Sequence, residues 1–360
     1  MLFNYPPHAD GSNWLQDFLI SLVIEALSSR LNGVSAKKWS KILPVARKSE
    51  LSGRSGLRRR YEALVQATKN LSVAEVNQAL HQLATQNYFS NVLSGTVKYQ
   101  IPSGSKDLFK KSLRDLFEFS FGLLDELKIA PQDTLSIRDS LYKKIYKSMP
   151  GHYCPFCGID RFDAPNPNIP RHPLDHYLAI SLYPIFGANI SNLVSMCGRC
   201  NSSFKLASDM LVDNSGLPRA CIDPYGQQTA KISLINSIPF GGGEKGQLPQ
   251  WTIDFIPAIQ EFETWDNVFS IRLRYKESIL NAEYKAWLDE FSRWAIDGHI
   301  VINNNHDASA ALLRWASICS DLNEQGFLKK PMFEMLSESA KQQDENGKRV
   351  TNLVKTLCSI

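Results

Sequence analysis

The sequence predicts a mainly α-helical protein with a small module held by a four-cysteine zinc site. Apolar residues recur at helical spacing over much of residues 1–150 and 226–360, and paired cysteines occupy the less regular stretch between them. We therefore expect a helical N-terminal region (1–150), a cysteine module (151–225) and a mostly helical C-terminal region (226–360). The chain has 360 residues, 43% hydrophobic and 21% charged, which is typical of a globular protein with a sizeable core.

Helix signals are clear in the N-terminal region. Ser72 and Glu75 form a capping box that begins a helix running to about Gln86. Apolar residues at helical spacing predict two further helices, over residues 105–128 and 137–145. These helices make the N-terminal region a predominantly helical body.

The C-terminal region begins differently. Short strand-like runs and a glycine-rich loop occupy residues 226–262. Large apolar and aromatic residues then return at helical spacing over residues 264–298, and further helices are predicted over 307–323 and about 331–357. The aromatic residues of these helices are expected to pack in a core, not to stack on bases.

Positive charge is concentrated in one segment. The net charge of +4 is too small to prove a nucleic-acid partner. Residues 31–70, however, hold ten Lys and Arg against two acidic residues, a local charge of +8. Within this segment Arg58, Arg59 and Arg60 are candidate nucleic-acid contacts, and a solvated helix face is an equal alternative for them.

Neither a signal peptide nor a membrane span is expected. The apolar stretch over residues 14–27 contains Asp17 and Glu25, and no uncharged apolar run reaches the length that a bilayer requires. The seven cysteines are an odd number in a chain of ordinary size, which disfavours a secreted disulfide framework. We expect a cytoplasmic protein that has no membrane partner.

The strongest motif is a pair of Cys-x2-Cys sequences, Cys154/Cys157 and Cys197/Cys200. Each pair can direct two thiolates at one ion, and four thiolates complete the tetrahedral shell of a structural zinc ion. The alternative is four unrelated buried cysteines, which the paired spacing disfavours. The three remaining cysteines have no such spacing and are expected to be ordinary core residues: Cys221, Cys319 and Cys358.

Between and after these pairs lie residues suited to phosphodiester hydrolysis. His176 offers an imidazole base, Asp175 a carboxylate ligand, Asn201 an amide oxygen and Lys205 a cation for phosphate. Mg²⁺ favours such oxygen ligands, and hydrolysis needs both a base and a cation that stabilises the leaving oxygen. His172 is a supporting candidate, as a phosphate contact, a second base or a residue that orients the site.

The stretch from Tyr153 to Lys205 resembles the HNH endonucleases of the ββα-metal superfamily. The resemblance covers some 50 of the 360 residues and rests on motifs in the family's order: Cys154/Cys157, Asp175-His176, Asn192-Leu193, Cys197/Cys200-Asn201 and Lys205. The sequence from Asp175 to Leu178, with Tyr183-Pro184, is most similar to the HNH nucleases of bacterial anti-phage systems such as the Septu type. The final His of the family name is replaced by Asn201, which we interpret as a variant ligand.

The resemblance implies a role for each matching residue. His176 would activate water as the general base, and Asp175 and Asn201 would bind a catalytic Mg²⁺ or Mn²⁺. Asn192 would hold the loop between strand and helix through backbone hydrogen bonds. The implied fold is a β-hairpin that carries Asp175 and His176, packed on a helix that begins near Asn201. Adjacent strand residues point to opposite faces, so both can serve one site only if the strand ends or twists there.

These expectations lead to one leading function and two alternatives. The leading function is a metal-dependent endonuclease that cleaves DNA as an effector of anti-phage defence. The alternatives are a catalytically silent, zinc-stabilised module that binds nucleic acid or protein, and an HNH nuclease directed at RNA such as transfer RNA. Because an uncontrolled nuclease harms its host, we also expect the helical regions to dock a regulatory partner such as an ATPase, or to form a homo-oligomer.

Overall fold

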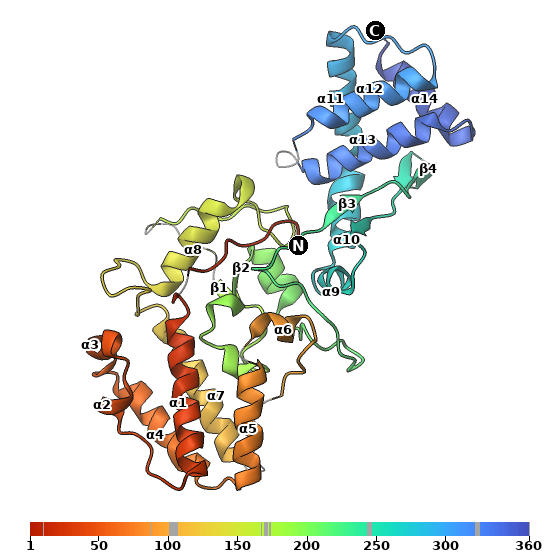
Figure 1. Ribbon diagram of the computed structural model, residues 1–360. Coiled ribbons are helices and arrows are strands. Elements are labelled where there is room, and N and C mark those ends of the chain that lie inside the picture. Colours follow the sequence, from red (N-terminus) through yellow and green to blue (C-terminus); the bar gives the residue numbers. More distant parts are fainter. Residues whose placement is uncertain are drawn as a thin grey trace. The chain divides into compact units, whose positions relative to one another are not determined.

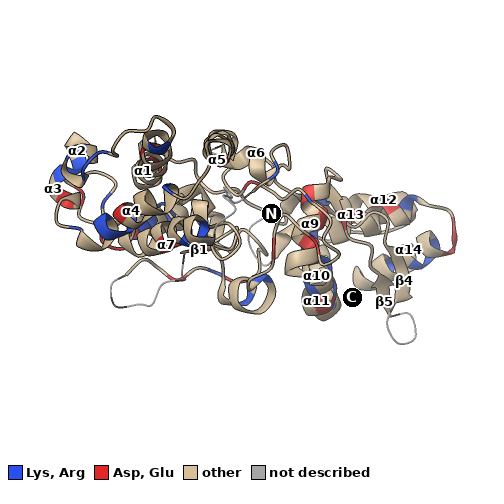
Figure 2. Ribbon diagram, turned by 90° about the horizontal axis from the view of Figure 1, so that it is seen from below, with Lys and Arg blue, Asp and Glu red and all other residues tan. Residues whose placement is uncertain are grey.

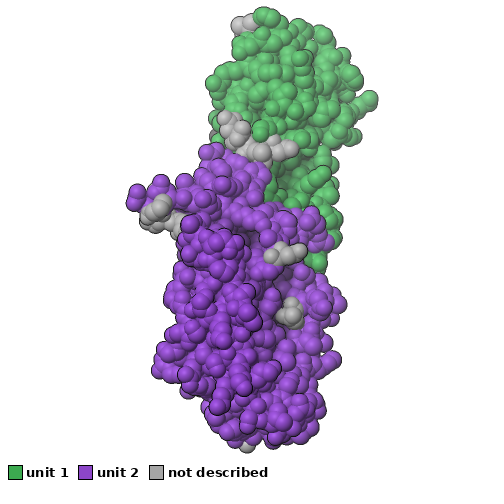
Figure 3. All heavy atoms as spheres, turned by 60° about the vertical axis from the view of Figure 1, so that its left-hand side comes forward, with its two compact units in different colours: residues 1–3, 156–160, 229–360 green, residues 4–155, 161–228 purple. Residues whose placement is uncertain are grey.

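The chain is mainly helical, as the sequence predicts: in the computed structural model 55% is helix and 7% is strand (Figure 1). The structure describes residues 1–9, 11–86, 88–100, 107–166, 168, 172, 174–242, 247–320 and 325–359. The chain divides into two compact units, coloured in Figure 3. Unit 1 contains residues 1–3, 156–160 and 229–360, and unit 2 contains residues 4–155 and 161–228.

Unit 2 is built around packed helices. They are α1 (Trp14–Leu31), α2 (Trp39–Ile42), α3 (Lys48–Leu51), α4 (Ser55–Thr68), α5 (Val73–Gln86), α6 (Phe89–Leu93), α7 (Asp107–Leu123) and α8 (Ile137–Ser148). Helix α1 packs against α4, α5 and α7, and α4 also packs against α7. Their apolar faces are buried between them, because amphipathic helices gain stability chiefly from such packing.

The capping box is present where the sequence predicts it. The Ser72 backbone N–H donates to the Glu75 carboxylate at 2.7 Å, and the Glu75 N–H donates to the Ser72 hydroxyl at 3.3 Å. These reciprocal bonds satisfy two helix-end donors and begin α5, which ends at Gln86. Helix α7 ends at Leu123, before the end of the predicted range 105–128, because i→i+3 bonds tighten the chain after it.

A small antiparallel strand pair lies within unit 2. Strand β1 (Leu174–His176) pairs with β2 (Leu193–Ser195), with Asp175 opposite Val194 and His176 opposite Leu193. Short 3₁₀ turns occupy Pro150–His152, Pro184–Phe186 and Ile190–Asn192, and the short π-helical segment η5 (Cys200–Lys205) follows β2. This arrangement holds the residues between the two cysteine pairs close to the helical body, because α7 contacts the turn at 184–186.

Unit 1 combines two strand pairs with a second helical body. Strands β3 (Lys231–Ser233) and β6 (Asp254–Ile256) pair antiparallel, as do β4 (Ile238–Gly242) and β5 (Leu248–Gln250). The helices are α9 (Gln260–Phe269), α10 (Ile271–Tyr275), the π-helical η7 (Lys276–Leu280), α11 (Asn281–Asp297), α12 (Asn305–Ile318), α13 (Gly326–Lys341) and α14 (Glu345–Leu357). Helix α13 packs against α12 and α14.

Two long helices predicted in unit 1 are divided in the structure. The range 331–357 contains two helices, because the Asp344 carboxylate accepts the Gly347 N–H at 2.8 Å and so begins a new helix. The range 264–298 is interrupted at Ser270, whose φ is 51°.

In the part of the chain that is described, no helix is long and apolar enough to cross a membrane.

Candidate metal centre and catalytic site

The four motif cysteines form one buried cluster. The Sγ atoms of Cys154, Cys157, Cys197 and Cys200 all lie within 4.8 Å of one another. In a tetrahedral zinc site with Zn–S bonds of about 2.3 Å, neighbouring sulfurs lie roughly 3.8 Å apart. Four buried thiols at this spacing could hold a metal such as zinc.

Backbone N–H groups surround the sulfurs of this cluster. The Cys200 N–H donates to the Cys197 sulfur at 3.4 Å, the Ile159 N–H to the Cys157 sulfur at 3.4 Å and the Cys197 N–H to the Cys154 sulfur at 3.3 Å. Hydrogen bonds to the charged form favour that form, so these donors stabilise thiolates. The chemistry of the cluster therefore fits a cation bound by four thiolates.

The first Cys-x2-Cys turn is fixed by its surroundings in unit 1. The Trp265 indole N–H donates to the Phe156 carbonyl at 2.9 Å, and the Tyr275 hydroxyl donates to the Cys157 carbonyl at 2.9 Å. Gly158 follows with φ of 66°, a backbone conformation that side-chain-bearing residues rarely adopt. A Cβ atom at Gly158 would also lie 2.5 Å from the Leu2 side chain.

Asn192 fastens the chain between β1 and β2. Its side-chain oxygen accepts the Leu178 N–H at 2.7 Å, and its amide nitrogen donates to the carbonyls of Leu178 at 3.1 Å and Phe186 at 3.3 Å. The Asn192 side chain is completely buried. These bonds to the backbone set the path of the chain that leaves β1 at His176.

Two tyrosine hydroxyls secure the strand opposite His176. Tyr5 donates to the Ser195 carbonyl, and Tyr225 donates to the Leu193 carbonyl. Both acceptors belong to β2, which pairs with only one other strand among the described residues. The hydroxyls thus satisfy carbonyls of β2 and keep this short strand in place.

His176 is the last residue of β1 and is 4% exposed. Its Nε2 lies 2.9 Å from the Gly187 carbonyl oxygen. A carbonyl only accepts, so Nε2 carries the proton and Nδ1 of the neutral ring has the lone pair. The ring also packs against Phe121 of α7, with 4.2 Å between ring centroids. These contacts fix both the tautomer and the orientation of the imidazole.

The burial of His176 favours a neutral imidazole. Burial lowers the pKa of His176 below its usual value, the Gly187 carbonyl and the Asp175 carboxylate act in the opposite direction, and Lys205 and Arg138 lower it further. A base needs an unprotonated nitrogen, so this balance keeps His176 in the form that can accept a proton.

Asp175 and Lys205 complete the charged surroundings of His176. The Asp175 carboxylate accepts the His176 backbone N–H at 2.8 Å, so its side chain folds back at the end of the strand. Lys205 is 1% exposed; burial lowers its pKa and the Asp175 carboxylate raises it. Lys205 is therefore a buried cation near Asp175 and not a freely exposed surface lysine.

Asn201 has an unused acceptor. It lies in η5 with Lys205, and its backbone N–H donates to the Cys197 carbonyl at 3.0 Å. Its side-chain Oδ1 is buried and accepts no hydrogen bond from the described residues. A buried oxygen without a donor is costly unless another group, such as a cation, satisfies it. Oxygen ligands of the Asp175 and Asn201 type suit Mg²⁺ or Mn²⁺.

Arg138 is a residue of this site that the sequence analysis did not identify. It lies at the start of α8, and its Nη2 donates to the Leu174 carbonyl in β1 at 3.1 Å. Its guanidinium lies 4.6 Å from the centroid of the Phe121 ring, the ring that packs against His176. Its Nε is buried and has no acceptor among the described residues. Arg138 precedes the motif region and lies in a helix that is recognised only by its apolar residues. No motif spacing therefore marks it as a residue of the site.

The remaining candidates have other partners. His172 lies 3.1 Å from the Asp163 carboxylate and packs against Phe162. Among the three arginines of α4, Arg58 pairs with Glu62 at 2.7 Å, and Arg60 pairs with Asp115 and lies 3.9 Å from the centroid of the Phe119 ring. Arg59 is exposed. Of the arginine triplet, two guanidiniums are therefore already engaged by acidic side chains.

No protein-family model, curated protein or solved structure matches this chain. Its function is therefore inferred from the contacts and the chemistry of the site itself.

Proposed function

We propose that the protein is a metal-dependent endonuclease of the HNH type that hydrolyses phosphodiester bonds in DNA. One observation carries the proposal: the buried His176 ring is fixed through Nε2 by the Gly187 carbonyl, which leaves Nδ1 as the basic nitrogen. A general base needs such a lone pair on a ring that is held in place. The resemblance of residues 153–205 to HNH endonucleases supports the same assignment.

In this proposal each residue has a defined task. His176 Nδ1 takes a proton from the attacking water, and the Gly187 carbonyl stabilises the imidazolium that forms. Asp175 and Asn201 would hold a divalent ion, which supplies charge stabilisation of the leaving oxygen when it is bound. Burial lowers the pKa of His176 and, with smaller contributions from Lys205 and Arg138, keeps the ring unprotonated before the reaction. The four-cysteine cluster would hold a structural zinc ion without an open position.

The alternative function is a binding module without catalytic activity. It would retain the four cysteines, but it gives no role to the unused Oδ1 of Asn201. RNA is the other open substrate, because these residues address the phosphodiester and not the sugar.

The test compares the wild type with His176→Ala and with His81→Ala, which removes an exposed histidine on α5. Each protein is incubated with Mg²⁺ or Mn²⁺ and with single- and double-stranded DNA and RNA. We expect DNA cleavage that falls roughly 10²- to 10⁴-fold in His176→Ala and is unchanged in His81→Ala. Equal cleavage by both variants would remove His176 from the mechanism. Cleavage of RNA alone would reassign the substrate, and binding with no cleavage under any metal would favour the binding module.

A role in anti-phage defence is part of the proposal and has its own test. Cells that carry the wild-type gene should restrict phage plating, and cells with His176→Ala should not. The proposed control by a partner, such as an ATPase, or by self-association is tested by light scattering coupled to size exclusion. A monomer that is fully active alone would contradict such control.

A further inference from the structure

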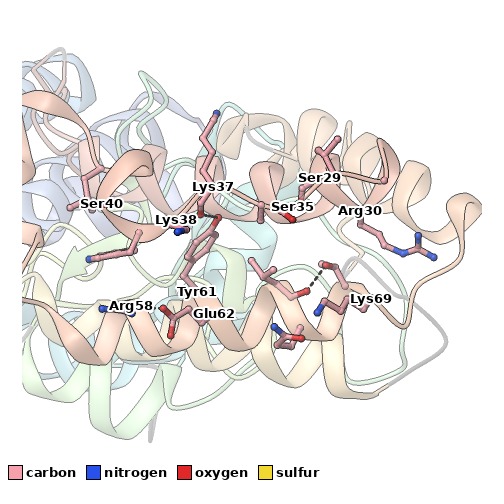
Figure 4. A pocket seen from close by; sticks show the side chains of 18 of the residues that line it. Ser29, Arg30, Ser35, Lys37, Lys38, Ser40, Arg58, Tyr61, Glu62 and Lys69 are labelled. Carbon is pink, nitrogen blue, oxygen red and sulfur yellow. Dashed lines mark hydrogen bonds and ion pairs between the residues drawn. The ribbon is translucent and has the colours of Figure 1, made fainter.

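Unit 2 contains a cleft that lies outside the histidine site. Its volume is about 960 Å³, and it is formed by the end of α1, the chain over residues 33–43, and parts of α3 and α4 (Figure 4). The residues labelled in Figure 4 approach it from these separate stretches of chain. We call this feature the basic cleft, because its walls carry six cationic side chains: Arg30, Lys37, Lys38, Lys48, Arg58 and Lys69.

Most of this positive charge is not neutralised locally. Glu62 is the one acidic residue among those that line the cleft, and it pairs with Arg58 at 2.7 Å. Lys37 pairs with Glu25 at 2.9 Å. The other four cations, Arg30, Lys38, Lys48 and Lys69, pair with no carboxylate in the described part of the chain. Figure 2 shows the corresponding concentration of Lys and Arg over α2, α3 and α4.

The cleft lacks an exposed aromatic platform. Trp39 and Tyr61 line it, but they are only 7% and 2% exposed. Bases that stack on a protein need an accessible ring face, so these rings offer little to a base. The cleft thus presents positive charge without an accessible ring face, which suits phosphate oxygens more than bases.

We propose that the basic cleft binds the phosphate backbone of a nucleic-acid strand and anchors the substrate apart from the histidine site. The choice of nucleic acid as the ligand rests on the proposed function. Lysines act as point charges toward phosphate and read no base sequence, so the binding is independent of sequence. This placement moves the nucleic-acid interface from the Arg58–Arg60 triplet, where Arg60 is held by Asp115 and Phe119, to the unpaired cations Lys38, Lys48 and Lys69.

The experiment measures binding, so it does not depend on cleavage. Fluorescence anisotropy of labelled 20-mer duplexes of two unrelated sequences is recorded against salt for the full chain carrying His176→Ala. The same titration follows with Lys38→Gln and Lys69→Gln added. Each lost phosphate contact lowers the slope of log K against log salt by about 0.9, so we expect the slope to fall by about 2, equally for both sequences.

The matched control adds Lys285→Gln and Lys355→Gln, which remove two exposed lysines from α11 and α14 of unit 1. This control should keep the parent slope, and all variants should keep the parent melting temperature because the altered lysines are exposed. Equal slopes for the cleft variant and the control would overturn the proposal. The proposal would also be overturned if ATP or pyrophosphate bound tightly at Lys38 and Lys69 and the duplex did not compete for the site. That result would identify a small phosphorylated ligand. Loss of cleavage in every assay would refute the proposed function and leave this binding result standing.

Discussion

The Nε2 atom of His176 lies 2.9 Å from the carbonyl oxygen of Gly187, eleven residues later in the chain. The bond joins the end of β1 to the residue that follows the turn at 184–186. Helix α7 lies against both partners, because the Phe121 ring packs on His176 and the Phe117 backbone lies beside Gly187. The position of one carbonyl thus determines which nitrogen of a buried imidazole can act as a base.

Gly187→Ala should disturb this contact directly. An added Cβ would lie 2.7 Å from the Ile180 Cδ1 atom and 3.0 Å from the Phe117 carbonyl oxygen, and that backbone cannot give way easily. We expect a loss of about 1–3 kcal/mol in the free energy of unfolding and at least a tenfold loss of cleavage. Urea denaturation and the nuclease assay measure the two effects. Gly122→Ala in α7, with no atom within 4 Å, should be neutral or slightly stabilising, and a Gly187→Ala protein with unchanged stability and cleavage would refute the role of this turn.

Asn192→Ala should destabilise unit 2. The change leaves the Leu178 N–H without its acceptor and removes a donor from the Leu178 carbonyl, while the Phe186 carbonyl keeps the Asn189 N–H. The Asn192 side chain is completely buried, so water cannot easily replace the lost bonds. We expect about 2–4 kcal/mol less stability in chemical denaturation. Asn352→Ala on the exposed face of α14 is the control and should change stability by less than about 0.5 kcal/mol. A similar small effect of Asn192→Ala would contradict the importance of these bonds.

Metal analysis should find one tightly held zinc ion per chain. Cys197→Ser should lower this content toward zero and reduce the melting temperature, because the cluster then has one thiolate fewer. Cys358→Ser is the control, since Cys358 lies outside the cluster, and it should keep the zinc. Full zinc content in the Cys197→Ser protein would disprove the four-thiolate site.

Arg138→Met should reduce cleavage while the protein stays folded. Methionine keeps much of the bulk over Phe121, but it loses the donor to the Leu174 carbonyl, the ion pair with Asp125 at 2.5 Å and the positive charge near His176. We expect at least a tenfold fall in kcat/KM, measured against Arg293→Met on α11 as the control for loss of an exposed arginine. If Arg138→Met changes only stability and leaves both kcat and KM unaltered, Arg138 has no part in the site.

His8 should make the fold sensitive to acid. Burial and the nearby Lys144 lower the pKa of His8 from 6.5 to about 4, and its ring packs against Tyr225 with 4.1 Å between centroids. Between pH 6.5 and about pH 4, His8 binds a proton in the unfolded chain but not in the folded chain. The contribution of His8 to the free energy of unfolding is therefore fully present above pH 6.5 and is lost as the pH falls toward 4. The loss amounts to at most about 3 kcal/mol.

The variant His8→Phe keeps a ring against Tyr225 and removes the titrating group. Urea denaturation at pH 7, 5.5 and 4.5 should show a smaller loss of stability for His8→Phe than for the wild type. The comparison cancels the contribution of the carboxylates, which titrate in both proteins. Parallel pH profiles for the two proteins would show that His8 is not responsible.

The sequence by itself determined the elements whose signals are local. Helical spacing gave the mainly helical class, the Ser72–Glu75 capping box gave the start of α5, and the Cys-x2-Cys spacing gave the four-cysteine cluster. These signals can be recognised in the sequence because a capping box and a Cys-x2-Cys pair each depend on residues only a few positions apart. The break at Ser270 was missed because apolar residues continue on both sides of it, at Phe269 and Ile271. The break at Asp344 was missed although residues 341–349 carry no large apolar side chain.

Only the tertiary structure decided what surrounds the candidate base. Arg138 and Phe121 come from helices far upstream of His176, and the carbonyl that fixes its tautomer belongs to Gly187, a residue type with no side-chain signal. The positively charged segment over residues 31–70 could be recognised in the sequence, but only folding determined which of its cations are neutralised. Arg60 pairs with Asp115, whereas Lys38 and Lys69 have no carboxylate partner among the described residues. Burial and long-range pairing depend on residues that the chain brings together only when it folds, so spacing alone cannot reveal them.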